Sequence, residues 1–132
     1  MKVVYDFSPN LIRQVHVLFQ QVWWAEDRSL EDTENCILGS QVCIGLLDLE
    51  NNLIGFVRAI SDFTFKAIIF DVIVHYEHRE KGIGRQLLQL VMNHQKLQKV
   101  KHFELYCLPE VEKFYTQFGF SSSLEGIRLL RA

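Results

Sequence analysis

The sequence lacks the features that define several large classes of protein. It has three cysteines, and no two of them form a Cys-x-x-Cys pair, which argues against a zinc site and a disulfide framework. No stretch approaches the roughly 20 consecutive apolar residues of a membrane span. The N-terminus has neither the apolar core nor the small-residue cleavage site of a secretory signal. We therefore expect a cytoplasmic protein with reduced thiols, no metal and no membrane partner.

An excess of charge of one sign is also missing. The chain has 14 Lys and Arg against 16 Asp and Glu, so its net charge is −2 and it has no overall attraction to nucleic acid. Hydrophobic residues make up 48% and charged residues 23%, which is typical of folded globular proteins and too apolar for disorder. With 132 residues and no linker, we expect residues 1–132 to form a single domain.

Hydrophobic spacing predicts an α+β fold. The segment 66–75 is apolar on both faces and therefore belongs in the middle of a sheet. It should pair in parallel with 102–107 through a right-handed crossover. The element order β-α-α-β-β-β-α-β-α-β predicts a central mixed sheet flanked by helices. Helices are expected over 9–22, 30–38, 83–96 and 109–117, and strands over 2–7, 41–48, 53–61, 66–75, 102–107 and 124–131.

The stretch that indicates chemistry is the loop between the 66–75 strand and the helix that follows it. Gly82 and Gly84 allow backbone N–H groups to approach a ligand closely. The first turn of the helix leaves its N–H donors unpaired, and its dipole favours negative charge. The loop therefore predicts a site for a phosphate or pyrophosphate. Three cations add to it: Arg79, Lys81 and Arg85.

Two familiar phosphate loops do not fit these residues. A P-loop requires Gly-Lys-Ser/Thr, which is absent, and a dinucleotide fingerprint requires a third glycine where Leu87 stands. The loop instead resembles the acetyl-CoA loop of the GNAT superfamily of N-acetyltransferases, Arg/Gln-x-x-Gly-x-Gly/Ala, which residues 79–84 match. Residues 74–78 are similar to the family's Val-x-Pro-Glu-Tyr, with Tyr76 in place of proline. Residues 114–120 resemble its C-terminal Phe/Leu-Tyr-x-x-x-Gly-Phe.

The resemblance implies acetyl-CoA as the cosubstrate and assigns residues to it. The 66–75 and 102–107 strands would splay apart to admit the pantetheine arm. Backbone groups of Val72, Ile73 and Val74 would bind that arm like an added strand. The loop would hold the pyrophosphate through Arg79, Glu80, Lys81, Gly82, Ile83, Gly84 and Arg85.

The resemblance also implies a direct attack of the amine on the thioester, with no acyl-enzyme. A backbone N–H near Val74 would stabilise the oxyanion. Tyr115 matches the tyrosine that protonates the departing thiolate, and a phenol with a pKa of about 10 stays protonated at neutral pH. The alternative for Tyr115 is a purely structural core residue. Leu108 stands where many relatives carry an asparagine, which removes one polar contact to the cofactor arm.

The base that takes the proton of the amine is left open. Asp71 lies in a buried strand between apolar neighbours, so its carboxylate must be paired or its pKa must rise. Two roles fit Asp71: a general base, or a carboxylate neutralised by Arg58 or Lys66. His75 at the exit of the strand and Asp62 at another strand end are weaker candidates.

Local charge indicates where the acceptor enters. Residues 26–34 contain five acids and one arginine, a sum of −4, whereas residues 79–101 contain six cations and one acid, a sum of +5. An acidic rim would attract a cationic amine, although a solvated helix face explains it equally well. We expect the acceptor to lie against Trp24, Arg28 and Arg58, because aromatic faces suit ammonium groups and amines.

Three functions follow from these residues. The first is transfer of an acetyl group to a primary amine of a small molecule in a ternary complex. The second is acetylation of a protein or peptide, and the third is acyl-CoA binding without catalysis. The sequence leaves a monomer and a homodimer as equal alternatives.

Overall fold

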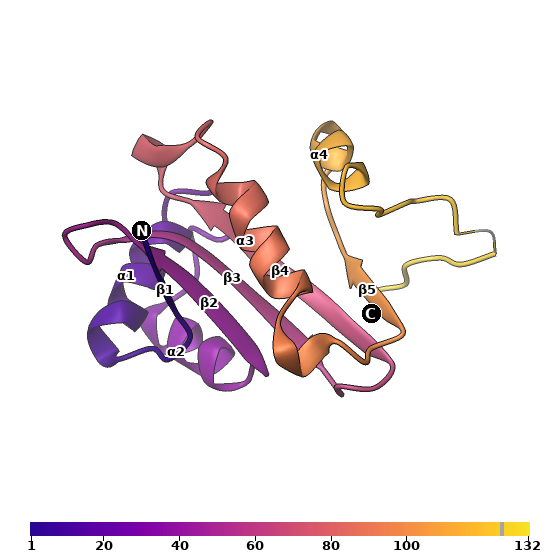
Figure 1. Cartoon of the computed structure of the whole chain (residues 1–132), viewed down its shortest axis with the longest axis horizontal. Helices are drawn as coiled ribbons and strands as arrows, with labels where there is room; N and C mark the ends of the chain where they lie inside the picture. The colour runs from indigo at the N-terminus through magenta and orange to yellow at the C-terminus, as the bar shows by residue number, and fades with distance from the viewer. Residues whose placement is uncertain (125) are drawn as a thin grey trace.

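The computed structural model describes residues 1–124 and 126–132, and its centre is a five-stranded sheet (Figure 1). The strands lie side by side in chain order, β1-β2-β3-β4-β5. The first four strands are antiparallel to their neighbours, and β4 and β5 are parallel, as predicted. The α+β fold with a mixed sheet is thus confirmed. The strands are β1 (Lys2–Val4), β2 (Val42–Leu47), β3 (Leu53–Ser61), β4 (Lys66–Val74) and β5 (His102–Leu105).

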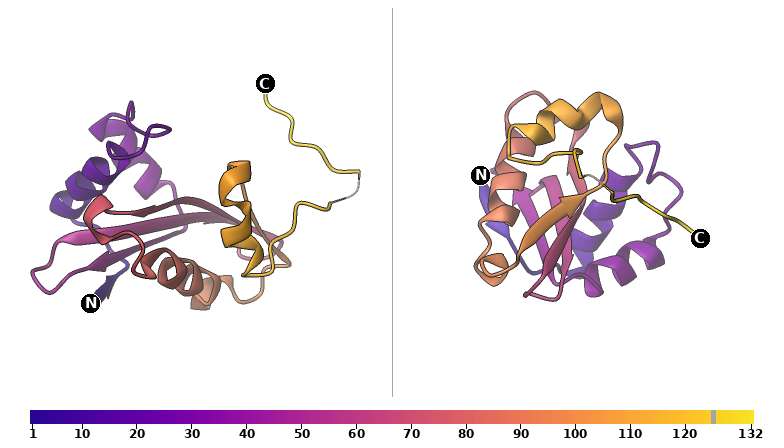
Figure 2. Two further views of the ribbon diagram at one scale, coloured as in Figure 1. Left: turned by 90° about the horizontal axis from the view of Figure 1, so that it is seen from above. Right: turned by 90° about the vertical axis from the view of Figure 1, so that its right-hand side faces the viewer.

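Helices cover both faces of this sheet. Figure 2 shows α1 and α2 on one face and α3 on the other. The hydroxyl groups of Ser8 and Ser29 cap α1 and α2, because they accept hydrogen bonds from the backbone N–H groups of Leu11 (3.2 Å) and Asp32 (3.0 Å). The helices are α1 (Pro9–Phe19), α2 (Leu30–Leu38), α3 (Ile83–Met92) and α4 (Glu112–Thr116), with 3₁₀ turns at η1 (Tyr76–His78), η2 (Gln95–Leu97) and η3 (Pro109–Val111).

The sheet separates two apolar layers. On one face, α3 buries Leu87, Leu88 and Val91 against β2, β3 and β4. The Cβ that a substitution would add at Gly55 in β3 lies 3.1 Å from atoms of Ile83 and Leu87, so glycine sets how closely α3 packs. On the other face, the buried side chains of α1 and α2 pack against the opposite side of β2, β3 and β4. The two layers fix where the chain leaves β4, which is where the predicted loop begins.

The predicted strand over 124–131 is wrong for the described residues, 124 and 126–131, none of which is in a strand. The tail extends away from the sheet (Figure 2). Its backbone hydrogen bonds are local, from Leu124 N–H to Ser122 and from Ile127 N–H to Leu124. A strand needs a neighbouring backbone to pair with, which the apolar residues of this segment alone do not supply.

Several predicted elements also end early. The expected helix over 109–117 is divided into η3 and α4, and the strand over 102–107 ends at Leu105.

A β-bulge interrupts the pairing of β3 with β4. Phe56 faces Ile73 and Arg58 faces Phe70, so two β4 residues, Asp71 and Val72, lie opposite one β3 residue. At the bulge, the backbone of Asp71 is left-handed, with a φ of 58°. The bulge reverses the alternation of the strand. Side chains before it and after it therefore exchange faces: Ala67 and Ile69 belong to the α3 layer, and Ile73 belongs to the α1 and α2 layer.

Candidate functional site

The open edge of β4 is the first component of the site. β4 and β5 pair only from Lys66 with His102 to Ile69 with Leu105. Beyond Ile69, β4 continues to Val74, whereas the chain after β5 turns toward α4 (Figure 1). Within residues 1–124 and 126–132, no strand pairs with residues 70–74 on that side. The predicted splay of the two strands is confirmed, and it leaves Val72, Ile73 and Val74 along an unpaired edge.

The loop after β4 is the second component. Glu80 and Gly82 have left-handed φ values of 63° and 80°, a backbone shape that turns successive N–H groups toward one concave side. No backbone carbonyl in the described part of the chain accepts a hydrogen bond from the N–H groups of residues 79–85. Since α3 begins at Ile83, its positive dipole end adds to these donors. The loop is therefore built to hold an anion.

Gly84 leaves space in front of these donors. A Cβ added there would lie 3.5 Å from Phe114 Cζ and 3.9 Å from Val74 Cγ2, which are ordinary contacts. Packing within the protein therefore does not require a glycine at this position. At Gly82, in contrast, the left-handed backbone itself favours glycine.

Two of the three cations of the loop contact other parts of the chain. Arg79 Nε donates a hydrogen bond to the Val74 carbonyl (3.2 Å). Arg85 donates to Gln117 Oε1, and its guanidinium lies 5.0 Å from the centre of the Phe118 ring, so it joins α3 to the residues after α4. Lys81 is exposed.

Tyr115 lies on α4, which borders the open edge. Its ring is half-buried between Phe114 and Phe120, with ring centres 5.0 and 6.2 Å away. The contact distance of 3.5 Å from a Cβ at Gly84 to Phe114 brings α4 against the loop. Burial, and to a lesser extent the nearby Cys107, raises the pKa of Tyr115 to about 12. The phenol therefore keeps its proton at neutral pH.

Asp71 and two arginines form the polar centre of the opposite face. Asp71 Oδ2 accepts from Arg58 Nε at 2.7 Å and from Arg28 Nη1 at 2.8 Å. Arg58 also donates to Ser40 Oγ at 3.3 Å. The pairing with Arg58 confirms one of the two predicted partners. Lys66 is not a partner of Asp71, because it pairs with Glu104 at 3.2 Å.

Of the three predicted acceptor residues, Arg28 and Arg58 contact this carboxylate, and Trp24 lies beside Arg28. The Arg28 guanidinium lies 4.5 Å from the centre of the Phe19 ring and 5.6 Å from that of Trp24. Arg58 lies 4.8 Å from the centre of the Phe70 ring. The sequence predicted neither the pairing of Arg28 with Asp71 nor the contacts of the two phenylalanines with the guanidinium groups. The residues concerned are far apart in the sequence, so no local spacing could reveal these contacts.

The other candidate bases have structural partners. His75 Nδ1 accepts from the Glu77 N–H (3.1 Å), and its ring stacks on Tyr76. The Asp62 carboxylate accepts from the N–H groups of Thr64, Phe65 and Lys66, and these hydrogen bonds lower its pKa. Asp62 therefore fixes the turn between β3 and β4.

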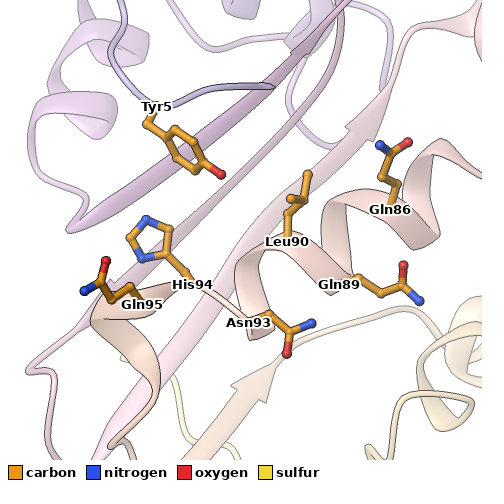
Figure 3. Close-up of a pocket in the computed structure, with 7 residues that line it drawn as sticks. All are labelled: Tyr5, Gln86, Gln89, Leu90, Asn93, His94 and Gln95. Atoms are coloured by element: carbon orange, nitrogen blue, oxygen red, sulfur yellow. The ribbon is translucent and has the colours of Figure 1, made fainter. Parts of the chain in front are cut away.

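Two surface hollows lie outside the predicted site. The larger, about 480 Å³, lies between the chain after β1 and the C-terminal half of α3 (Figure 3). The second, about 290 Å³, lies between α1 and the chain around His75. The larger hollow is lined by Tyr5, Gln86, Gln89, Leu90, Asn93, His94 and Gln95.

Comparison with known proteins agrees with this architecture. The sequence profile of the family described as "Acetyltransferase (GNAT) domain" matches residues 20–122, which include the loop and Tyr115. The chain therefore belongs to the GNAT family of acetyltransferases, whose cosubstrate is acetyl-CoA.

Individual relatives give the extent of the likeness. The "Uncharacterized N-acetyltransferase ycf52" of Gracilaria tenuistipitata var. liui is 29% identical over 120 residues, which are 89% of this chain and 65% of that relative. A crystal structure of an acetyltransferase assigned to the GNAT family, from Xanthomonas campestris pv. campestris, has a TM-score of 0.79 and 28% identity, covering 100% of this chain and 94% of that one.

An aminoglycoside 6'-N-acetyltransferase in complex with coenzyme A shares the fold. Its TM-score is 0.60 at 24% identity, covering 69% of this chain and 53% of that one.

No helix within residues 1–124 and 126–132 is long and apolar enough to cross a bilayer.

Replacement of Asp71 by asparagine tests the buried ion pairs. Asp71→Asn leaves two guanidiniums without a counter-charge, so we expect the free energy of unfolding to fall by about 3 kcal/mol. Urea denaturation measures the change, and Asp6→Asn, at an exposed position, is the control. A loss no larger than that of the control would contradict this account of the bulge.

Replacement of Gly84 by alanine tests the loop. The added methyl group has only ordinary protein contacts, so the melting temperature should stay the same or rise slightly. The same methyl group stands in front of the unpaired donors, so the Kd for coenzyme A should rise by at least ~10-fold, or about 1.4 kcal/mol. Calorimetry measures the Kd, with Gln89→Ala, exposed on the same helix, as the control. Unchanged affinity would show that ligand does not lie against Gly84.

Titration of Tyr115 tests its burial. The pKa of a tyrosine is about 10 in an unfolded chain, and that of Tyr115 in the folded protein is about 12. The folded state therefore retains this proton more strongly, and the resulting stability is complete below pH 10 and is lost as the pH rises toward 12. Between these pH values, wild type should lose more stability than Tyr115→Phe. If denaturant titrations show equal losses of stability in wild type and Tyr115→Phe, the phenol is exposed to solvent.

Proposed function

We propose that this protein transfers the acetyl group of acetyl-CoA to a primary amine of a small molecule. The observation that carries the proposal is the open edge of β4 beside a loop whose backbone N–H groups have no partner in the described chain. An edge of this kind suits the amide groups of a pantetheine arm, and the loop suits a pyrophosphate. The three free cysteines fit a reducing compartment, and we place the protein in the cytoplasm.

The binding roles follow from this geometry. Backbone groups of Val72, Ile73 and Val74 hydrogen-bond the pantetheine arm. The N–H groups of Glu80, Lys81, Gly82, Ile83, Gly84 and Arg85 hold the pyrophosphate, with the ammonium group of Lys81 added. Arg79 stabilises the start of the same loop, because its side chain donates a hydrogen bond to the Val74 carbonyl. This fixes the end of β4 next to the reacting thioester.

The reaction forms one bond and breaks another. The neutral amine attacks the thioester carbon, so a C–N bond forms while the C–S bond breaks. The backbone N–H near Val74 stabilises the negative charge on the carbonyl oxygen. Tyr115 donates its proton to the departing thiolate, the excess proton of the amine passes to water, and the tyrosinate regains a proton from water.

Asp71 is better suited to position arginines than to act as the base. Its Oδ2 accepts from two guanidinium groups, so this oxygen is already engaged within the protein. We therefore assign Asp71 the neutralising role that the sequence left open. Through Asp71, Arg28 and Arg58 are held at the face of β4 where we place the acceptor, together with Trp24.

Removal of the Tyr115 hydroxyl tests the reaction. A general acid contributes roughly 10²- to 10⁴-fold, so Tyr115→Phe should lower kcat by at least ~100-fold. The KM for acetyl-CoA should change little, because the ring remains. Release of free thiol from acetyl-CoA with a panel of amines, aminoglycosides and peptides measures the rate, and Tyr5→Phe is the control.

The same panel separates the alternatives. Turnover with Lys-rich peptides alone would indicate a peptide acetyltransferase. Coenzyme A binding without release of thiol with any acceptor would indicate a binding module and would overturn the proposed activity. Wild-type kcat in Tyr115→Phe would remove Tyr115 from the role of acid.

A further inference from the structure

The cluster around Asp71 has more positive than negative charge. Arg28 and Arg58 both donate to Oδ2 of this one carboxylate, at 2.8 and 2.7 Å. Among residues 1–124 and 126–132, no second carboxylate lies within 4.0 Å of either guanidinium. The five acids of residues 26–34 are all exposed, and none of them forms an ion pair with Arg28 or Arg58. The cluster therefore has a net charge of +1.

The surplus positive charge lies in a largely buried cluster, where an unpaired charge is energetically unfavourable. The side chain of Asp71 is 3% exposed and that of Arg58 is 11% exposed. An uncompensated charge in such surroundings favours a bound counter-ion. Arg28 gives access, because 31% of its side chain is exposed.

The geometry of Arg28 suits an anion with two oxygens. Only Nη1 of its guanidinium has an acceptor among the described residues, so Nε and Nη2 keep their donors. The ring of Phe19 and that of Trp24 lie against the guanidinium and restrict its orientation. A planar fork held in this way matches a carboxylate or a phosphate and loses little entropy on binding.

The position of the cluster links it to the acceptor. Asp71 immediately precedes Val72, the first residue assigned to the pantetheine arm, and the side chains of Asp71 and Phe70 both contact Arg58. An anionic group at Arg28 therefore lies on the α1 and α2 face, beside the end of β4 where the thioester is placed. Arg28 is well placed to hold one end of an acceptor while its amine reaches the thioester.

We propose that the acceptor is a small amine that also carries a carboxylate or phosphate group, and that Arg28 binds this anionic group while Arg58 supports Arg28 through Asp71. This inference rests on the proposed function and specifies the substrate class for the same site. It differs from the expectation of a simple cationic amine attracted by an acidic rim.

Matched pairs of amines test the proposal in the full-length chain. One pair is glutamate and its diamide, and the other is O-phosphoethanolamine and ethanolamine, so the two pairs separate a carboxylate from a phosphate. Saturating coenzyme A occupies the loop, so a further rise in melting temperature on adding an amine reports a second site. We expect the anionic member of at least one pair to raise the melting temperature and to be acetylated with kcat/KM at least ~10-fold higher, equivalent to about 1.4 kcal/mol.

Variants assign the effect to the arginine. Arg28→Gln should abolish the preference for the anionic member, and Arg28→Lys, which keeps the charge and loses the fork, should retain part of it. Arg13→Gln, at an exposed position on α1, is the matched control and should keep the preference. In Arg28→Gln, Asp71 keeps Arg58 as a partner, and the shift with coenzyme A alone checks that the variant is folded.

The outcomes separate this inference from the proposed function. A shift with the anionic members that depends on Arg28 supports the inference, whether or not acetyl transfer follows. Equal shifts with both members of each pair, or no shift with any of them, overturn it. The proposed function stands or falls separately, on the response to coenzyme A alone and on the release of thiol with any amine.

Discussion

Two guanidinium groups hold the carboxylate of Asp71 at the β-bulge, where β4 has one residue more than the paired segment of β3. A left-handed φ of 58° is uncommon for a residue other than glycine, and aspartate tolerates it better than most. The ion pairs stabilise this conformation from the face of α1 and α2. Because the bulge reverses the alternation of side chains, one strand can contribute to both apolar layers. The other components of the site follow from this geometry.

The bulge also explains why the edge of β4 is open. Pairing with β5 ends at Ile69, two residues before Asp71, and the chain after β5 turns toward α4. A strand that bends and twists at a bulge diverges from a straight parallel neighbour. The divergence leaves unpaired backbone at Val72 to Val74, and β4 leads directly into the loop with free N–H donors. An extended ligand can therefore follow one strand from its middle to the helix that comes after it.

The sequence predicted the features that depend on neighbouring residues. The place of β4 inside the sheet, its parallel pairing with β5 and the glycine loop all follow from local patterns. It did not predict the bulge, because a segment that is apolar on both faces gives no alternation in which one extra residue would be visible. The contact of Arg28 with Asp71 joins positions 43 residues apart. Such contacts arise from tertiary packing, and so does the absence of strand pairing at residues 124 and 126–132.

Residues 26–34, which run from the chain before α2 into its first turns, show why a sum of charges is a poor guide to a ligand. They add to −4, yet their single cation pairs with the buried Asp71, whereas their five acids are exposed. Solvent and salt screen the exposed acids, whereas the half-buried arginine acts over a short distance in a less polar environment. The inward charge therefore dominates what a ligand next to β4 encounters. The acceptor that we propose carries charges of both signs, so its anionic group would bind Arg28 while the exposed acids attract its ammonium group before that group loses a proton.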